Sequence, residues 1–550
     1  MSGRSSGGVA GDFGTHDFVV VGAGSAGCVL ASRLSENGRH SVALLEAGGE
    51  HDRFWVNVPF GYPMLFSNPE VNWMFDSQPE PGLNGRTTYQ PRGKILGGTS
   101  SINGMVYNRG NPADYDEWRD AGCAGWGWDD VLPYFRKAQK QVRGESAFHG
   151  GSGPLHVCDP VEPLELADAV IAAGVEAGLP ARSDFNAGEQ EGIGYWQTTT
   201  HKARRWSSAN AYLDPARRRQ NLRVVTEAHA TRIVLDGKRA TGVEFIRHGS
   251  LHHIKARREV VLAAGAFGSP QLLMLSGIGP AAHLRALEVP VRHDLSGVGE
   301  NLQEHFYAQL MFRCLKPITA NELYKSRWRK LIEGMRYVFF RRGMLASNGV
   351  AAGAFFRSDP ALARPDMQMN FNPWSVASRT RGGMVPHDFP GFTLSAIHLK
   401  PEARGTVRLA SPDPFAAPEL RFNFLQSDYD VGAMVSGIRF LRRLSQQAAL
   451  RAYVCGEIQP GRDVASDADL EAFVRSNGYA NLHPVGACGM GVGADAVVSP
   501  RLDVHGIGGL RVVDTSVMPR VPAGNTHAPA VMIAEKASQM ILADAQGTGQ

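Results

Sequence analysis

DFVVVGAGSAG, at residues 17–27, is the stretch that decides the fold of this 550-residue chain. A β-branched apolar run ends at three glycines, Gly22, Gly24 and Gly27, and a helical pattern follows through residue 34. The first glycine permits a tight turn, the second lets backbone approach a pyrophosphate, and the third packs the helix on the strand. The stretch therefore predicts a dinucleotide site at the N-terminus of a helix that begins near Ser25 and Ala26.

A second predicted strand, residues 41–45, ends at Glu46, and Ala47 follows it. Glu46 stands about 20 residues after the last glycine, the spacing at which a carboxylate accepts hydrogen bonds from the adenosine ribose hydroxyls. The same carboxylate disfavours NADP, because it would repel the 2′-phosphate. These residues leave NAD and FAD open.

A second glycine-rich passage, PRGKILGGTSSING, occupies residues 91–104. It has no steady helix or strand period and is rich in residues that expose backbone N–H groups. We expect it to form a loop that lines a ligand.

This passage is one of several that resemble, in order, the motifs of the glucose-methanol-choline (GMC) oxidoreductases. The others are GAFGSP at 265–270, LSGIG at 275–279, VGENLQEH at 298–305, HPVG at 483–486 and LRVVD at 510–514. The resemblance extends over about residues 16–540, and within the family the sequence is similar to the bacterial alcohol/choline dehydrogenase-like branch. It implies an α/β protein with a Rossmann-like FAD-binding domain and a substrate domain built on an antiparallel sheet, as in glucose oxidase-like folds.

The motif positions predict a discontinuous domain division. The FAD-binding domain comprises 16–154, 222–310 and 480–545, the substrate-binding domain comprises 155–221 and 311–479, and 1–15 form a flexible N-terminus. In the second insert, residues 393–399, 406–409 and 420–424 alternate like strands of one antiparallel sheet that roofs the flavin.

The resemblance also implies the residues that hold FAD. They are Gly22, Gly24, Ser25, Ala26, Gly27, Glu46, Ala47, Gly98, Thr99, Asn103, Gly104, Met105, Val106, Ala230, Asp514 and Thr526. Asn103 is expected beside flavin and substrate, with a turn-stabilising side chain as the alternative. Asp514 is expected near the ribityl and pyrophosphate groups, with a helix-capping acid as the alternative. Some relatives attach FAD covalently through a histidine where this chain has Ile102, so noncovalent FAD is expected.

Oxidation of an alcohol requires the hydroxyl proton to leave as hydride moves to flavin N5, and histidine has a pKa suited to that task. His483 matches the family's catalytic base, and His527 matches its second catalytic position, which is asparagine or histidine in relatives. We expect His483 to take the proton and His527 to donate a hydrogen bond to the substrate oxygen. Asn103, Phe371, Trp374 and His398 are expected to line the substrate pocket, although each of the last three fits a core position equally well.

The implied activity is oxidation of a primary alcohol, aliphatic or aromatic, to the aldehyde (EC 1.1.-.-). The electron acceptor stays open between O2, as in an oxidase, and a quinone or other carrier, as in a dehydrogenase. An FAD-containing lyase that cleaves cyanohydrins is the alternative, and the oligomeric state is open, a homo-oligomer included.

Charge and cysteine patterns restrict the partners. A net charge of +4 with interleaved signs disfavours nucleic acid. Six scattered cysteines suggest neither a disulfide framework nor a metal site, and the N-terminus lacks an apolar signal, so we expect a cytoplasmic protein. Residues 325–342 (KSRWRKLIEGMRYVFFRR) mix basic and large apolar side chains, which fits peripheral membrane contact, but a helix that covers the substrate domain fits better.

Overall fold

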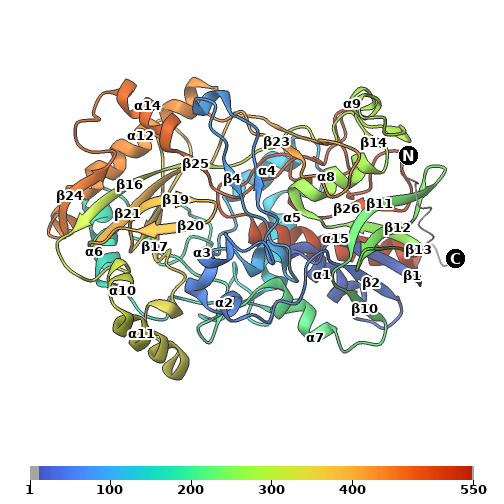
Figure 1. The fold of residues 1–550 in the computed structure, drawn as a ribbon, viewed down its shortest axis with the longest axis horizontal. Coiled ribbons are helices and arrows are strands. Elements are labelled where there is room, and N and C mark those ends of the chain that lie inside the picture. Colours follow the sequence, from blue (N-terminus) through green and yellow to red (C-terminus); the bar gives the residue numbers. More distant parts are fainter. Residues whose placement is uncertain (1–10, 548–550) are drawn as a thin grey trace, which may run out of the picture.

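The computed structural model describes residues 11–547 and contains two large sheets, one in each half of the molecule (Figure 1). The first has seven strands: β10 (Leu222–Val225), β2 (Val42–Leu45), β1 (Gly11–Val21), β13 (Ser250–Leu262), β12 (Arg239–Arg247) and β11 (His229–Asp236) in that order, and β26 (Leu510–Val512) beside β13. The strands β10, β2, β1, β13 and β26 are parallel, whereas β12 and β11 continue the sheet in antiparallel fashion. Residues 11–15, expected to be flexible, instead form the first part of β1, where they pair with β13; residues 1–10 lie outside the described residues.

The helices α1 (Ser25–Leu34) and α15 (His527–Gly547) pack against each other, and α5 (Trp128–Ala138) packs on α15. The helix α1 begins after Gly24, whose backbone is extended and which provides no side-chain cap. The first N–H groups of α1 are therefore left for another partner. The predicted strand, glycine turn and helix are all confirmed.

The second sheet is antiparallel throughout, which confirms the predicted fold class. Its order is β24 (Val454–Gln459), β16 (Phe306–Cys314), β21 (Gly391–His398), β18 (Met367–Asn372), β17 (Ala352–Phe356) and β7 (Gly192–Tyr195), and β25 (Tyr479–Ala480) pairs with β16. Three helices pack against this sheet: α6 (Glu165–Glu176), α12 (Asp428–Ser445) and α14 (Asp467–Asn477).

One strand prediction was wrong in its pairing. Residues 406–409 and 420–424 were expected in the same sheet as 393–399, but β22 (Thr406–Arg408) and β23 (Glu419–Arg421) form a separate two-stranded sheet. The backbone N–H groups in this segment have other partners. The amides of Gly405 and Val407 donate to the carbonyls of Leu302 and Gly299, which precede β16, so these amides cannot also pair with β21.

Short elements complete the described chain. The helices are α2 (Phe54–Asn57), α3 (Tyr62–Leu65), α4 (Pro112–Asp120), α7 (Asp214–Ala216), α8 (Gly265–Leu275), α9 (Ala281–Ala286), α10 (Asn321–Lys325), α11 (Arg327–Phe340) and α13 (Ala448–Arg451). The short strand pairs are β3 (Phe75–Asp76) with β4 (Tyr89–Gln90), β5 (Gln139–Gln141) with β6 (Leu155–Val157), β8 (Thr200–His201) with β9 (Arg204–Arg205), β14 (Ile278–Gly279) with β15 (His293–Asp294), and β19 (Val376–Thr380) with β20 (Gly383–Pro386). Within residues 11–547, every helix is too short or too polar to span a bilayer. The domain boundaries stay a prediction, and β16 of the second sheet begins before the proposed boundary at residue 310.

Candidate active site

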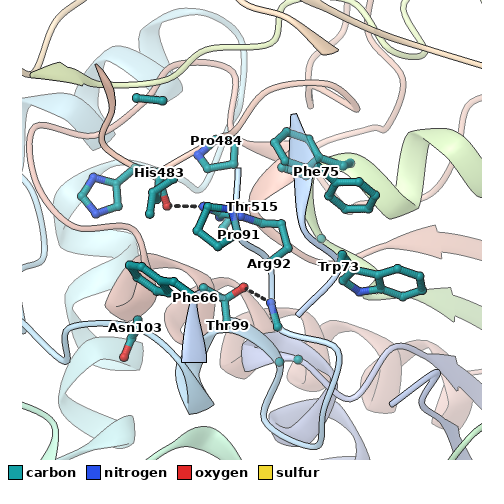
Figure 2. Close-up of a pocket in the computed structure, with 18 of the residues that line it drawn as sticks. Phe66, Trp73, Phe75, Pro91, Arg92, Thr99, Asn103, His483, Pro484 and Thr515 are labelled. Atoms are coloured by element: carbon teal, nitrogen blue, oxygen red, sulfur yellow. Dashed lines mark hydrogen bonds between the residues drawn. The ribbon is translucent and has the colours of Figure 1, made fainter. Parts of the chain in front are cut away.

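A cavity of about 810 Å³ is lined by residues from both sheets and by the loop at residues 98–106. Figure 2 shows His483 and Asn103 on one side of it and the rings of Trp73 and Phe75 on the other. Nearly all predicted cofactor residues line this cavity; those that do so are Gly22, Gly24, Ser25, Ala26, Glu46, Ala47, Gly98, Thr99, Asn103, Gly104, Met105, Val106, Ala230, Asp514 and Thr526.

Glycines bring two loops together at one end of the cavity. A Cβ on Gly98 would lie 2.6 Å from the Cα of Gly24, closer than any side chain permits, and the amide of Gly97 donates to the carbonyl of Ala23. Gly27 does not line the cavity, because it is packed against the turn at Gly22. A Cβ on Gly27 would lie 1.8 Å from the carbonyl oxygen of Gly22. Its role is to pack α1 on the turn, as the spacing predicts.

The carboxylate of Glu46 is fixed by backbone. Its two oxygens accept hydrogen bonds from the amides of Ala23 and Gly48, each at 2.8 Å. Burial raises the pKa of Glu46 to about 7 despite these hydrogen bonds. Each oxygen keeps a second lone pair, so the side chain is able to accept from ribose hydroxyls as well.

Asn103 stands in a turn and also lines the cavity. Its side-chain oxygen accepts from the Met105 amide at 3.1 Å and from the Arg205 guanidinium at 2.8 Å. The position of Asn103 is therefore consistent with both expectations. Its side-chain oxygen stabilises the turn, and the residue also borders the cavity. Arg205 is buried, also donates to the carbonyls of Val56 and Ser100, and has its pKa lowered to about 9 by burial.

Asp514 is the N-cap of the short 3₁₀ helix Thr515–Val517 and also accepts from Gly265, the first residue of α8. One oxygen accepts from the Gly265 amide and the Ser269 hydroxyl, and the other accepts from the amide and hydroxyl of Ser516. Burial raises the pKa of this carboxyl. The capping alternative therefore describes its contacts, although Asp514 also borders the cavity.

His483 is held at both ring nitrogens. The Asn108 amide donates to the Asn525 side-chain oxygen at 2.9 Å, which turns the Asn525 amide nitrogen toward His483 Nε2 at 3.0 Å. A donor at that position requires a lone pair on Nε2, so the proton of the neutral ring sits on Nδ1. Nδ1 then donates to Nδ1 of His305 at 3.0 Å, while the side-chain nitrogen of Asn481, itself a donor, lies 3.2 Å from the same Nδ1 and cannot hydrogen-bond to it in this tautomer.

His483, His305 and His527 are all neutral near pH 7. Burial lowers the pKa of His483 well below its ordinary value, and the neighbouring His305 and Arg92 lower it further. Burial also lowers the pKa of His305 to about 3. For His527 the value is about 4, again mainly through burial and then through Arg205.

His527 begins helix α15 and lines the same cavity as His483. Its Nδ1 lies 3.1 Å from the hydroxyl of Ser25, and its Nε2 makes no hydrogen bond within the described protein. If Ser25 donates to Nδ1, the proton of the neutral ring lies on Nε2, where it is available to a ligand. Only Thr526 separates His527 from Asn525, the residue that contacts His483, so one short segment links the two histidines.

Two predicted pocket residues were wrong. Phe371 and His398 are fully buried away from the cavity, whereas Trp374 lines it. Side chains alternate along a strand: Asn370 and Asn372 of β18 face the cavity, so Phe371 points to the opposite side and packs near Phe392.

The same alternation in β21 places Ser395 and Ile397 at the cavity and turns His398 toward α12. There its Nδ1 lies 3.6 Å from a carboxylate oxygen of Asp430, and its ring stands edge-on to Tyr429.

Sequence reasoning missed several residues at the site. Asn108 and Asn525 orient His483, Arg205 holds Asn103, and Arg379 extends over the ring of Tyr479 and donates to the Tyr307 hydroxyl. Asn525 was accessible to sequence reasoning, because it stands in the same motif as His527. Nothing in the sequence distinguishes Arg205 or Arg379 from surface arginines.

Comparison with known proteins identifies the family. The GMC oxidoreductase models match residues 16–307 and 401–534. The chain belongs to the GMC oxidoreductase family. This GMC oxidoreductase is 42% identical over 534 residues to an oxygen-dependent choline dehydrogenase of Photobacterium profundum, covering 96% of this chain and 93% of the relative. It is also 42% identical to the enzyme of that name from Rhizobium meliloti, covering 96% and 95%.

Solved structures agree in fold. Pyridoxine 4-oxidase from Mesorbium loti superposes with a TM-score of 0.86 at 30% identity, covering 95% of this chain and 98% of that one. A variant of formate oxidase from Aspergillus oryzae superposes with a TM-score of 0.92 at 27% identity, covering 98% and 100%. Like other members of this family, the GMC oxidoreductase described here is an FAD-dependent enzyme that acts on alcohols.

The residues present fit FAD. The approach of Gly24 and Gly98 leaves bare backbone where a pyrophosphate has to pass, and α1 offers its uncapped N–H groups there. Glu46 and Ala230 both line this cavity, as required of groups that contact ribose and adenine.

Proposed function

We propose that this enzyme oxidises an uncharged primary alcohol, aliphatic or aromatic, to the aldehyde, with His483 as the base. FAD, when bound, supplies the acceptor for hydride. The observation that carries the proposal is the pair of neutral histidines, His483 and His527, which line one cavity and are linked through Asn525.

The hydrogen-bond network supports separate roles for the two rings. Nε2 of His483 carries the lone pair that takes the hydroxyl proton, and the substrate hydroxyl displaces the Asn525 amide nitrogen that occupies this lone pair in the free enzyme. The imidazolium that results keeps its Nδ1–H bond to His305. Nε2 of His527, which has no protein partner, donates to the substrate oxygen and orients it.

Cofactor retention without a covalent bond is part of the proposal. Ile102 is fully buried and packs in a small apolar cluster with Val56, Leu65, Val71 and Ile95. It offers no nucleophile, so the glycine loops, Glu46 and the N-terminus of α1 hold FAD by hydrogen bonds and packing.

A cationic substrate is disfavoured by the charges around the cavity. Three carboxylates line it: Glu46 and Asp514 are held by backbone and serine groups, and Asp76 pairs with Arg381 at 3.2 Å. The face of Tyr479, where a quaternary ammonium would bind, already carries Arg379 with its guanidinium carbon 5.4 Å from the ring centroid. This arrangement favours an uncharged alcohol over choline, although the relatives described above carry the name choline dehydrogenase.

The relatives described above are dehydrogenases and oxidases, which gives no support to the cyanohydrin-lyase alternative. The test is an anaerobic absorbance titration of the purified enzyme with benzyl alcohol, hexanol and choline, followed by air. Bleaching by benzyl alcohol or hexanol supports the proposal, and recovery in air or only after a quinone is added identifies the acceptor. A kcat/KM for choline far above those for both uncharged alcohols would overturn the substrate assignment.

The base is tested by His483→Ala, with His387→Ala as a control. His387 is half-buried and contacts Ser375, away from the cavity lining. We expect H483A to lose about 10²- to 10⁴-fold in the rate of flavin reduction with FAD still bound, and H387A to keep the wild-type rate. An unchanged rate in H483A would contradict the assignment.

A further inference from the structure

The exposed apolar side chains of the described chain gather on one side. Of eighteen large exposed apolar residues, eleven belong to α2, α3, α10 and α11. They are Phe54, Trp55, Met64, Tyr324, Trp328, Leu331, Ile332, Met335, Val338, Phe339 and Phe340. We call this set the α11 face. In Figure 1, α2 and α11 both lie along the lower edge of the molecule.

These short helices form one surface. Helix α11 packs on the turn at Met344–Ala346, which packs on the turn at Pro59–Gly61 between α2 and α3. The link is apolar, because Tyr337 of α11 is buried in a cluster with Val58, Ala203 and Ala346.

The outer side of α11 is not used by the rest of the described chain. Tyr337 is its only buried residue, while Trp328 and Phe339 are each 73% exposed. A contiguous apolar surface of this kind marks an interaction site, and a fourteen-residue helix gains little stability in water on its own. The sequence-based expectation of a helix that covers the substrate domain and exposes a basic face is therefore wrong for the apolar side of the helix, which also faces outward.

Charge indicates what covers this face. Residues 321–342 hold seven basic and two acidic side chains, a net charge of +5, against +4 for the whole chain. Lys325 and Arg329 pair with Glu322, whereas Arg327, Lys330 and Arg341 form no ion pair within the described residues. A second copy would bring the same basic patch against itself if the pair were twofold symmetric, which like-charge repulsion disfavours.

We propose that the α11 face docks on the surface of a bilayer that contains anionic lipids. Helix α11 lies in the plane of the interface, with Trp328, Phe339 and Phe340 in the headgroup and acyl boundary and the unpaired basic groups at the lipid phosphates. Large exposed apolar and aromatic side chains combined with Lys and Arg are the composition of interfacial helices, and clustered basic groups bind anionic lipid surfaces.

Part of the cavity wall adjoins this face. Tyr62 and Pro63 of α3 line the cavity while the next residue, Met64, is exposed on the α11 face. The hairpin β19–β20 contacts α3, and there Met384 lines the cavity while Val385 is exposed. A docked enzyme would thus hold this part of its cavity close to the bilayer, where apolar alcohols and lipid-soluble electron acceptors concentrate. The docking itself does not depend on the proposed substrate.

The test is co-sedimentation of the full-length, FAD-loaded enzyme with sucrose-filled vesicles of phosphatidylcholine, with and without about one third phosphatidylglycerol. We expect binding to the anionic vesicles that weakens with added salt. Two variants address the two contributions: Trp328→Ser with Phe339→Ser and Phe340→Ser, and Arg327→Glu with Lys330→Glu. Each should reduce the partition coefficient at least tenfold.

The matched control is Arg218→Glu with Lys255→Glu, which changes the charge equally at two exposed residues elsewhere on the described surface. It should bind almost as the wild type does, and bound-flavin spectra establish that every variant is folded. The proposal is overturned if the wild type ignores anionic vesicles or if all variants bind alike. It is also overturned if the enzyme is a dimer that the apolar variant converts to a monomer, because the face would then belong to a second copy.

Discussion

Gly98→Ala tests how the two glycine loops build the FAD cradle. Gly98 has φ +53°, and its added Cβ would lie 2.6 Å from the Cα of Gly24, where ordinary contact begins at 3.4 Å. One loop must therefore retreat by about 0.8 Å. The left-handed backbone costs an alanine roughly 1–2 kcal/mol, and forcing atoms into a packed site costs roughly 1–3 kcal/mol more.

Gly38→Ala separates these two costs. Gly38 also has positive φ, +71°, but nothing lies within 4 Å of its added Cβ. Titration of apoenzyme with FAD, followed by flavin fluorescence, should give a Kd raised at least tenfold in G98A, a difference of about 1.4 kcal/mol, and almost unchanged in G38A. Equal affinities in both variants would refute the idea that close approach of the loops at residues 24 and 98 forms the cofactor site.

Three further predictions follow from the site and its supports. Burial lowers the pKa of His483 and sets that of His527 at about 4, so both rings are neutral above pH 6.5. The kcat/KM for a primary alcohol should therefore be level above pH 6.5 and fall as the pH drops through the lowered pKa values. An inflection above pH 7 in the pH–rate profile would contradict this. Since Ile102 offers no nucleophile, acid precipitation should leave the FAD in the supernatant, and yellow colour retained in the washed pellet would disprove noncovalent binding. The fully buried carboxylate of Glu535 pairs with Arg33 at 2.7 Å, so Glu535→Gln should lower the free energy of unfolding by about 3–5 kcal/mol and lower the thermal midpoint. As the control, Glu36 is a 54% exposed partner of the same arginine, and Glu36→Gln should leave the midpoint almost unchanged.

Local patterns in the sequence were sufficient for the cofactor half of the protein. The strand at residues 17–21, the turn at Gly22 and the helix from Ser25 were predicted because each depends on neighbouring residues alone. The motif order then predicted which distant segments meet, and fifteen cofactor positions do line one cavity. The acid at Glu46 belongs to this set because strand length fixes its distance from the glycine turn.

The tertiary structure alone decided the side-chain contacts at the reacting end. Phe371 and His398 fit a pocket by residue type, but strand register turns both away from it, and register depends on pairing between strands far apart in sequence.

The groups that hold His483 come from three separate segments: His305 and Asn525 contact its ring, and Asn108 orients Asn525, an arrangement that forms only when both sheets are folded. Likewise, the sequence contains the apolar side chains of α11, but their exposure follows from what the rest of the described chain does not cover. A sequence thus determines the residues available for chemistry, whereas long-range packing determines which of them face the same space.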